Sequence, residues 1–210
     1  MEQVNDRSKL RLFTAVELPH RWKEELGAAA AQIGQAGADV KPVQPDSIHA
    51  TLVFLGYQPP ASLPRIDAAL SVAARRIRPF RLALGRIGFF GQPHRLHVVW
   101  VGLDDPAAGM RALHGAVSEQ LRAQGVQFDT KPLVPHITLA RLRRPSDRGV
   151  SLRVHADLQS LHIATGLSFE VKEFVLMESQ LARSGPQYTV VGRFPLLGSA
   201  QRAHSLEDPH

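Results

Sequence analysis

Two histidine–threonine pairs with the same spacing are the residues of this chain best suited to chemistry. The four-residue pattern H-x-T-L occurs twice, beginning at His49 and at His136. Both copies lie in apolar, β-prone runs, and alternate side chains of a strand share a face. The first copy therefore places His49 beside Thr51. The second places His136 beside Thr138 in the same way. Two imidazoles and two hydroxyls that face one cleft are equipped to move protons around an oxyanion.

The repetition of the pattern carries more weight than either copy. Random placement of 10 His and 6 Thr in 210 residues gives roughly 0.3 matches to H-x-T. For one copy alone, the alternative is a polar His on a half-solvated strand and a Thr that favours β structure. Two copies, both followed by Leu and both in strand-like runs, favour a shared catalytic site.

Composition sets the broad class of the protein. A length of 210 residues with 44% hydrophobic and 21% charged residues is ordinary for one globular domain or two small lobes. The polar N-terminus does not resemble a signal peptide, no apolar run reaches the length of a membrane helix, and cysteine is absent. These features predict a cytoplasmic protein without membrane contact, disulfides or thiolate metal sites. A net charge of +6, carried largely by Arg, favours an anionic partner.

Hydrophobic periodicity predicts a mixture of strands and helices around the two motifs. Strands are predicted at 10–18, 48–56, 80–87, 96–103, 133–142, 168–179 and 188–195, and helices at 19–35, 63–78 and 106–124. Residues 88–95 are expected to form a turn-rich loop, and residues 198–210 are expected to be a disordered tail. Residues 143–149 are a polar stretch, and the region that follows up to residue 166 is only loosely patterned.

The order of these elements predicts the fold class. Strands and helices are interspersed without strict β-α-β alternation, which favours an α+β fold. We expect a single bilobal domain over residues 1–197, with two mostly antiparallel β-sheets, helices on the outside and pseudo-two-fold symmetry. One motif strand from each sheet would then face a central cleft.

With these motifs in place, the chain resembles the two-histidine phosphoesterase superfamily, specifically the RNA 2′,3′-cyclic phosphodiesterases once named 2′-5′ RNA ligases. The matching segments are RLF (11–13), IHATLVFLG (48–56), GRIGFFGQPHRLHVVWVGL (85–103), PHITLAR (135–141), FVLMES (174–179) and YTVVGRFPL (188–196). Two places depart from the family pattern. Ala50 is smaller than the usual residue, and 91–97 lacks some of the usual prolines and arginines, so no RNA contact is transferred to that segment.

The resemblance implies the opening of an RNA-terminal 2′,3′-cyclic phosphate to a 2′-phosphate, with reversible 2′-5′ ligation of tRNA halves as a side activity. It implies no metal and no cofactor, with His136 as the base and His49 as the acid that protonates O3′. Thr51 and Thr138 would donate hydrogen bonds to the non-bridging phosphate oxygens. The expected partner is RNA with a cyclic phosphate end, tRNA fragments included, and the expected state is a monomer.

Other residues and other functions stay open at this point. Arg141 is a candidate RNA or phosphate contact, although a regular strand would turn it away from His136. Phe89 and Phe90 are candidates for base stacking, and at least one of them is expected in the core. The other histidines show no metal-ligand spacing. The alternatives are a phosphodiesterase for a small cyclic nucleotide or cyclic phosphate, a non-catalytic RNA-end binder, and a metal-dependent hydrolase.

Overall fold

The computed structural model describes residues 9–143, 147–161, 163, 167–182 and 185–198. Its strands are β1 (Leu10–Glu17), β2 (Val40–Pro42), β3 (His49–Gln58), β4 (Phe80–Gln92), β5 (Arg95–Asp104), β6 (His136–Leu142), β7 (Ser168–Val171), β8 (Glu173–Ala182) and β9 (Gly185–Pro195). Its helices are α1 (His20–Gly34), α2 (Leu63–Arg76), α3 (Gly109–Ala123) and α4 (Arg148–Ser160), with the 3-10 turns η2 (Pro45–Ser47) and η3 (Pro60–Ser62).

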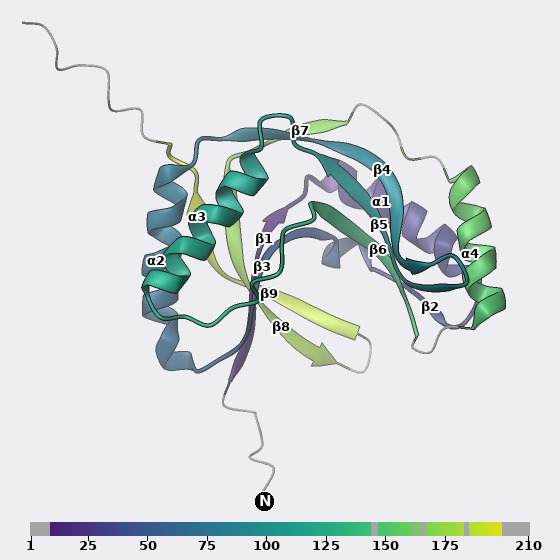
Figure 1. Ribbon diagram of the computed structural model, residues 1–210, viewed down its shortest axis with the longest axis horizontal. Coiled ribbons are helices and arrows are strands. Elements are labelled where there is room, and N and C mark those ends of the chain that lie inside the picture. The colour runs from purple at the N-terminus through teal and green to yellow at the C-terminus, as the bar shows by residue number, and fades with distance from the viewer. Residues whose placement is uncertain (1–8, 144–146, 162, 164–166, 183–184, 199–210) are drawn as a thin grey trace, which may run out of the picture.

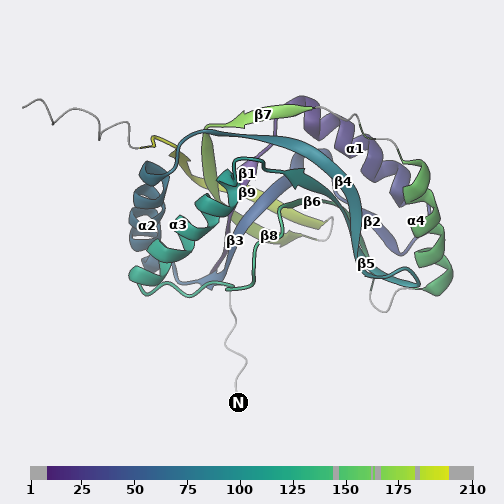
Figure 2. The same cartoon turned by 45° about the horizontal axis from the view of Figure 1, so that its top comes forward.

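All the strands join one curled antiparallel sheet in the order β7-β4-β5-β6-β3-β1-β8-β9, with β2 paired to β6. We call β7-β4-β5-β6 with β2 the first lobe, and β3-β1-β8-β9 the second lobe. The two lobes meet at one register pair, Ala50 with Ile137. Helices α1 and α4 lie outside the first lobe, and α2 and α3 lie outside the second (Figure 1, Figure 2). The predicted bilobal α+β fold is confirmed, and its two expected sheets are the halves of a single one.

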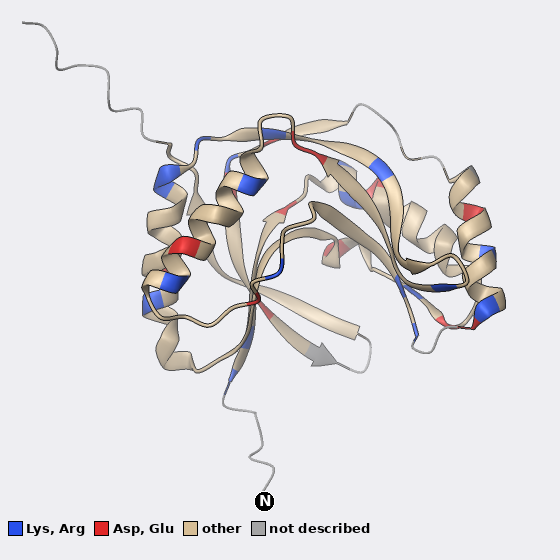
Figure 3. Cartoon of the chain, viewed as in Figure 1, with Lys and Arg blue, Asp and Glu red and all other residues tan. Residues whose placement is uncertain are grey.

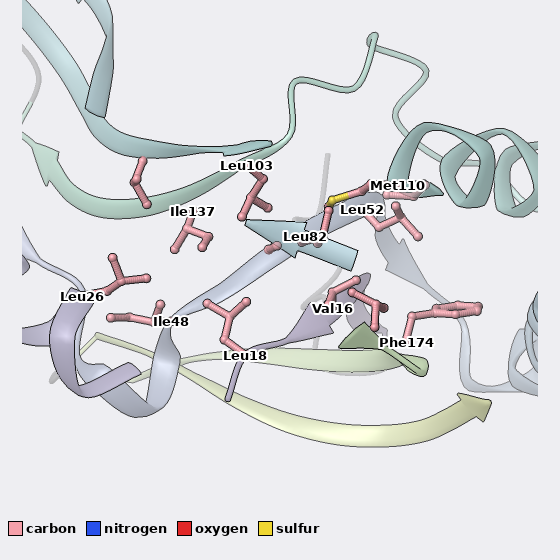
Figure 4. Close-up of a cluster of buried hydrophobic side chains, with 14 of the residues drawn as sticks. Val16, Leu18, Leu26, Ile48, Leu52, Leu82, Leu103, Met110, Ile137 and Phe174 are labelled. Carbon is pink, nitrogen blue, oxygen red and sulfur yellow. The ribbon is translucent and has the colours of Figure 1, made fainter. Parts of the chain in front are cut away.

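The hydrophobic core fills the space between the outer face of the sheet and the helices. Ala50 and Leu52 from β3 are fully or almost fully buried there, as are Ile137 and Leu139 from β6. Leu52 and Ile137 lie among the core side chains in Figure 4. Burial of an aliphatic side chain contributes about 1.5–3 kcal/mol, so the apolar positions of the two H-x-T-L motifs fix which face of each strand is turned outward. Ala50 therefore faces away from the histidines, as expected.

The segment predicted as a loop, 88–95, is mostly strand. β4 continues to Gln92 and β5 begins at Arg95, so only Pro93 and His94 form the turn. The glycines that indicated a loop serve the hairpin instead. Gly88 is paired with Trp100 across the two strands, and a Cβ at Gly88 would overlap the indole ring. Gly88 thus lets a large aromatic ring lie flat against the neighbouring strand.

The C-terminal third differs from the sequence analysis in two places. Helix α4, which the sequence analysis did not predict, occupies most of the loosely patterned region. The Asp147 side chain caps it by accepting a hydrogen bond from the Val150 amide at 2.9 Å. The strand predicted at 168–179 is divided at Lys172. Its first part, β7, pairs with β4 in the first lobe, and its second part, β8, pairs with β1 in the second.

The C-terminal tail predicted from residue 198 falls almost entirely outside the described residues. Gly198 is described, and its amide donates a hydrogen bond to the Ile77 carbonyl oxygen at 2.9 Å, just beyond the end of α2. The predicted domain boundary therefore stays a prediction.

Candidate active site

The two motif histidines are anchored in the same way. Nδ1 of His49 lies 2.8 Å from the Ser47 carbonyl oxygen, and Nδ1 of His136 lies 2.7 Å from the Val134 carbonyl oxygen. Each carbonyl oxygen belongs to the residue two positions earlier, and a carbonyl only accepts, so Nδ1 carries the hydrogen. In each neutral ring the lone pair is then on Nε2, which leaves that nitrogen available for proton transfer.

The threonines lie on the same strand faces as the histidines, as the motif spacing predicts. Along β3 and β6, the His and Thr positions are half-buried and the residues between them are buried. The Thr51 Oγ1 lies 3.0 Å from Nε2 of His49. Because that nitrogen carries a lone pair in the neutral ring, the Thr51 hydroxyl donates the hydrogen bond. Thr138 occupies the equivalent place beside His136.

The likeness between β3 and β6 extends beyond the four motif residues. The first seven residues of each strand, H-A-T-L-V-F-L and H-I-T-L-A-R-L, follow one order of half-buried, buried and exposed positions. Each strand also has a β-bulge, with Leu52 as the extra residue opposite β1 and Leu139 as the extra residue opposite β5. A bulge reverses the alternation of faces beyond it. The next exposed residue of each strand, Phe54 or Arg141, therefore returns to the histidine side.

The bulge changes what was expected for Arg141. A regular strand turns Arg141 away from His136, whereas the observed register pairs Arg141 with Val98. Val98 lies two residues from Trp100, which is paired with Thr138, so these side chains share one face. The structure thus brings His49, His136 and Arg141 to the same side of the sheet at the junction of the lobes. No sequence signal marks the bulge itself.

Both histidines are less basic than a histidine in water. Burial lowers the pKa of His49 to about 4, against an opposing hydrogen bond to Ser47, and the charges of Arg141, Lys23 and His136 lower it further. Burial also lowers the pKa of His136, and the charge of Arg141 adds to this effect. Each ring is therefore neutral at pH 7 in the free protein. The positive charge of Arg141 thus acts on both motif histidines.

Aromatic rings flank both histidines, one pair in each lobe. The centroid of His49 lies 5.0 Å from that of Phe13 and 5.1 Å from that of Tyr188. The centroid of His136 lies 5.2 Å from that of Phe90 and 6.1 Å from that of Trp100. Except for Phe90, sequence reasoning missed these rings, because they come from strands whose pairing partners the sequence does not reveal.

The two candidate stacking residues have separate places. Phe90 is exposed beside His136, whereas Phe89 packs against the core and its ring lies 5.3 Å from that of His155 on α4. The expectation that at least one of them packs in the core is confirmed.

Comparison with known proteins identifies the family of this chain. The model of the 2′-5′ RNA ligase superfamily matches residues 19–183. The chain belongs to this superfamily. Its relatives named RNA 2′,3′-cyclic phosphodiesterase include one from Thermus thermophilus, 34% identical over 92% of this chain and 93% of the relative, and one from Escherichia coli, 32% identical over 89% and 96%. A relative of the same name from Methanothermobacter thermautotrophicus is 29% identical over 90% of this chain and 100% of its own.

Solved structures of the superfamily share the fold. A crystal structure from Thermus thermophilus has a TM-score of 0.72 and 32% identity, and covers 90% of this chain and 100% of its own. Escherichia coli LigT in complex with 3′-AMP has a TM-score of 0.67 and 29% identity, over 90% and 98%.

Within the described part of the chain, no three His, Cys, Asp or Glu side chains gather as a metal site. None of the described helices is long and apolar enough to cross a membrane. Lys and Arg are spread over both lobes (Figure 3).

Proposed function

We propose that this superfamily member opens the 2′,3′-cyclic phosphate at an RNA end to a 2′-phosphate by metal-independent acid–base catalysis. The observation that carries the proposal is the matched pair of His49 and His136. Both rings donate through Nδ1 to the chain and leave Nε2 for proton transfer, on one side of the sheet where the lobes meet. Arg141 adds a positive charge beside both rings. The names of the relatives support the same reaction.

The reaction needs one proton acceptor and one proton donor on opposite sides of phosphorus. A water oxygen attacks phosphorus while Nε2 of His136 takes a proton from that water. The bond from phosphorus to O3′ breaks, and Nε2 of His49 gives its proton to O3′. The phosphate stays on O2′, so the product is a 2′-phosphomonoester. The roles of base and acid follow the family resemblance.

The non-bridging oxygens carry the charge that develops during attack. Thr51 and Thr138 lie on the same strand faces as the histidines, and Arg141 lies on that side too. Donors held in place before the reaction stabilise such charge more than water does. Arg141 also favours a phosphate over a neutral ligand.

The low pKa of His49 requires the substrate to help protonate the acid. With a pKa of about 4, His49 is neutral in the free protein. A cyclic phosphate brings a negative charge beside the ring, which favours the protonated form and offsets the repulsion from Arg141. Once Nε2 is protonated, it no longer accepts from Thr51. The Thr51 hydroxyl is then free to donate to a phosphate oxygen.

The test is the incubation of purified protein, with EDTA, with an RNA oligonucleotide that ends in a 2′,3′-cyclic phosphate. Chromatography resolves 2′- from 3′-phosphate products. His49→Ala and His136→Ala are each expected to lower the rate by about 10²–10⁴. Wild-type rates in both variants would refute the mechanism, and inhibition by EDTA would refute metal independence.

The same experiment separates the alternatives. Turnover of a small cyclic nucleotide but not of the RNA would identify a small-molecule phosphodiesterase. Binding of the RNA end without turnover would identify a binding protein. The monomeric state, the cytoplasmic location, tRNA fragments as substrates and the 2′-5′ ligase side activity stay predictions.

A further inference from the structure

A groove of about 500 Å³ lies beside His49 on the second lobe. It is lined by β1, by the second half of β3 and by residues 127–129, which precede β6 along the chain. The groove begins at Phe13, whose ring centroid is 5.0 Å from that of His49. Phe54, at 6.0 Å from Phe13, continues the wall. The groove is therefore continuous with the active site, although the mechanism does not use it.

Two cross-strand pairs line the groove on the histidine side of the sheet. Phe13 is paired with Phe54, and Arg11 with Tyr57. A second bulge, with Leu55 as the extra residue, lies between the two pairs. Arg11 and Phe13 are two residues apart on β1, so they share a face and lie about 7 Å apart along it. Leading away from His49, the groove thus presents first the Phe13–Phe54 pair and then the Arg11–Tyr57 pair.

The aromatic rings of the groove are open to solvent. Phe54 is 43% exposed and Tyr57 is 52% exposed, so both rings of the groove present area to a ligand. Exposed rings along one track are the surface on which successive bases of a single strand stack. Phe13 is buried and packs in the protein, whereas Tyr57 leaves about half of its surface open to a ligand.

The charged and polar groups of the groove suit a phosphodiester chain. Arg11 donates to the Ser179 hydroxyl at 2.8 Å, which holds its guanidinium over the groove. The Asp129 carboxylate is paired with the Lys131 ammonium at 2.9 Å, so its charge is largely compensated. The buried amide of Gln58 donates to the carbonyl oxygens of Leu55 and Gln127, and so fixes the wall.

The proposed reaction determines which part of the RNA chain extends from the active site toward the groove. His49 protonates O3′, so the ribose of the terminal nucleotide lies on the His49 side of phosphorus, and its 5′ oxygen leads to the next nucleotide. We propose that the groove binds the nucleotide 5′ to the cyclic phosphate end, with its base on Tyr57 and its phosphodiester at Arg11. This inference rests on the proposed function and makes the enzyme selective for RNA chains over single nucleotides.

The experiment compares kcat/KM for a nucleoside 2′,3′-cyclic phosphate with that for a dinucleotide that ends in the same cyclic phosphate. The wild type is expected to prefer the dinucleotide about tenfold or more, the range of one stacked base. Tyr57→Ala is expected to bring the ratio of the two kcat/KM values close to one, and Tyr57→Phe to retain the preference. Arg11→Gln is expected to lower the ratio of the two kcat/KM values and to make that ratio depend less on the salt concentration.

Arg81→Gln is the matched control, because Arg81 also donates to a serine hydroxyl at 2.8 Å but lies on β4, outside the groove. A wild type without preference for the dinucleotide would overturn the groove assignment while leaving the proposed function intact. A Tyr57→Ala variant that loses activity equally on both substrates would overturn it as well. Absence of turnover of either substrate by the wild type would instead refute the proposed function.

Discussion

His49 makes the stability of the folded chain depend on pH, independently of any activity. In the folded protein its pKa is lowered to about 4, mainly by burial, against an ordinary value of 6.5. Between these values the unfolded chain binds more protons at this position than the folded chain does. Lowering the pH through this range therefore favours unfolding. The stability that the neutral ring confers is fully present above pH 6.5 and is lost as the pH falls toward 4.

The magnitude follows from the two pKa values. Their full difference corresponds to about 3 kcal/mol in the free energy of unfolding. Between pH 7 and pH 4.5, about 2 kcal/mol of that is lost. His49→Asn removes the titrating group and keeps an amide that can donate to the Ser47 carbonyl oxygen. The variant should therefore lose about 2 kcal/mol less than the wild type over the same interval.

The assay is urea unfolding of both proteins at pH 7 and pH 4.5, with the free energies extrapolated to water. Every other titrating group is common to both proteins, so the difference between their two pH dependences isolates His49. His20→Asn, a change at an exposed histidine of α1, is the control for the loss of one histidine. Equal pH dependence in wild type and His49→Asn would refute the buried, neutral state of the ring.

Three further predictions concern the surroundings of the histidines. Thr51→Val or Thr138→Val should lower kcat by about 10²–10³ by removing a donor to the phosphate, and unchanged kcat would exclude that role. Arg141→Lys should raise KM for the cyclic phosphate more than it lowers kcat, because the charge remains while the planar fork is lost; steady-state kinetics on the RNA oligonucleotide measures both. Gly88→Ala should displace the Trp100 ring, shift its fluorescence and destabilise the fold by about 1–3 kcal/mol, and an unchanged spectrum and urea midpoint would contradict the close contact.

The motif strands were predictable because their pattern is set by burial. At the four motif positions, apolar residues alternate with His or Thr, and the core needs those apolar residues on one face. The resulting side-by-side placement of His49 and Thr51 follows from strand geometry alone. Periodicity of this kind survives any tertiary context in which one face is buried.

Other features depended on contacts that the sequence does not display. Arg141 faces the histidines because Leu139 forms a bulge opposite β5, and a bulge has no compositional signature in this strand. Gly88 indicated a loop, yet it is a strand residue covered by Trp100 from the next strand. Helix α4 was missed because few of its residues are buried, which leaves only a weak apolar stripe. For Arg141 and Gly88, the pairing with a neighbouring strand decided the local structure.

The path of the chain between the lobes has a consequence for folding. The chain passes between the lobes six times. It begins in the second lobe with β1, enters the first with α1 and β2, and returns to the second with β3 and α2. It then adds β4 and β5 to the first lobe, α3 to the second, the segment from β6 through α4 to β7 to the first, and finally β8 and β9 to the second. Neither lobe is a continuous piece of sequence, so neither can complete its sheet before nearly the whole chain is available. Long sequence separation between paired strands slows folding, and the pairing of β3 with β6 couples the two lobes. We therefore expect slow folding in a single cooperative transition, so that His49 and His136 come together only when both lobes are complete.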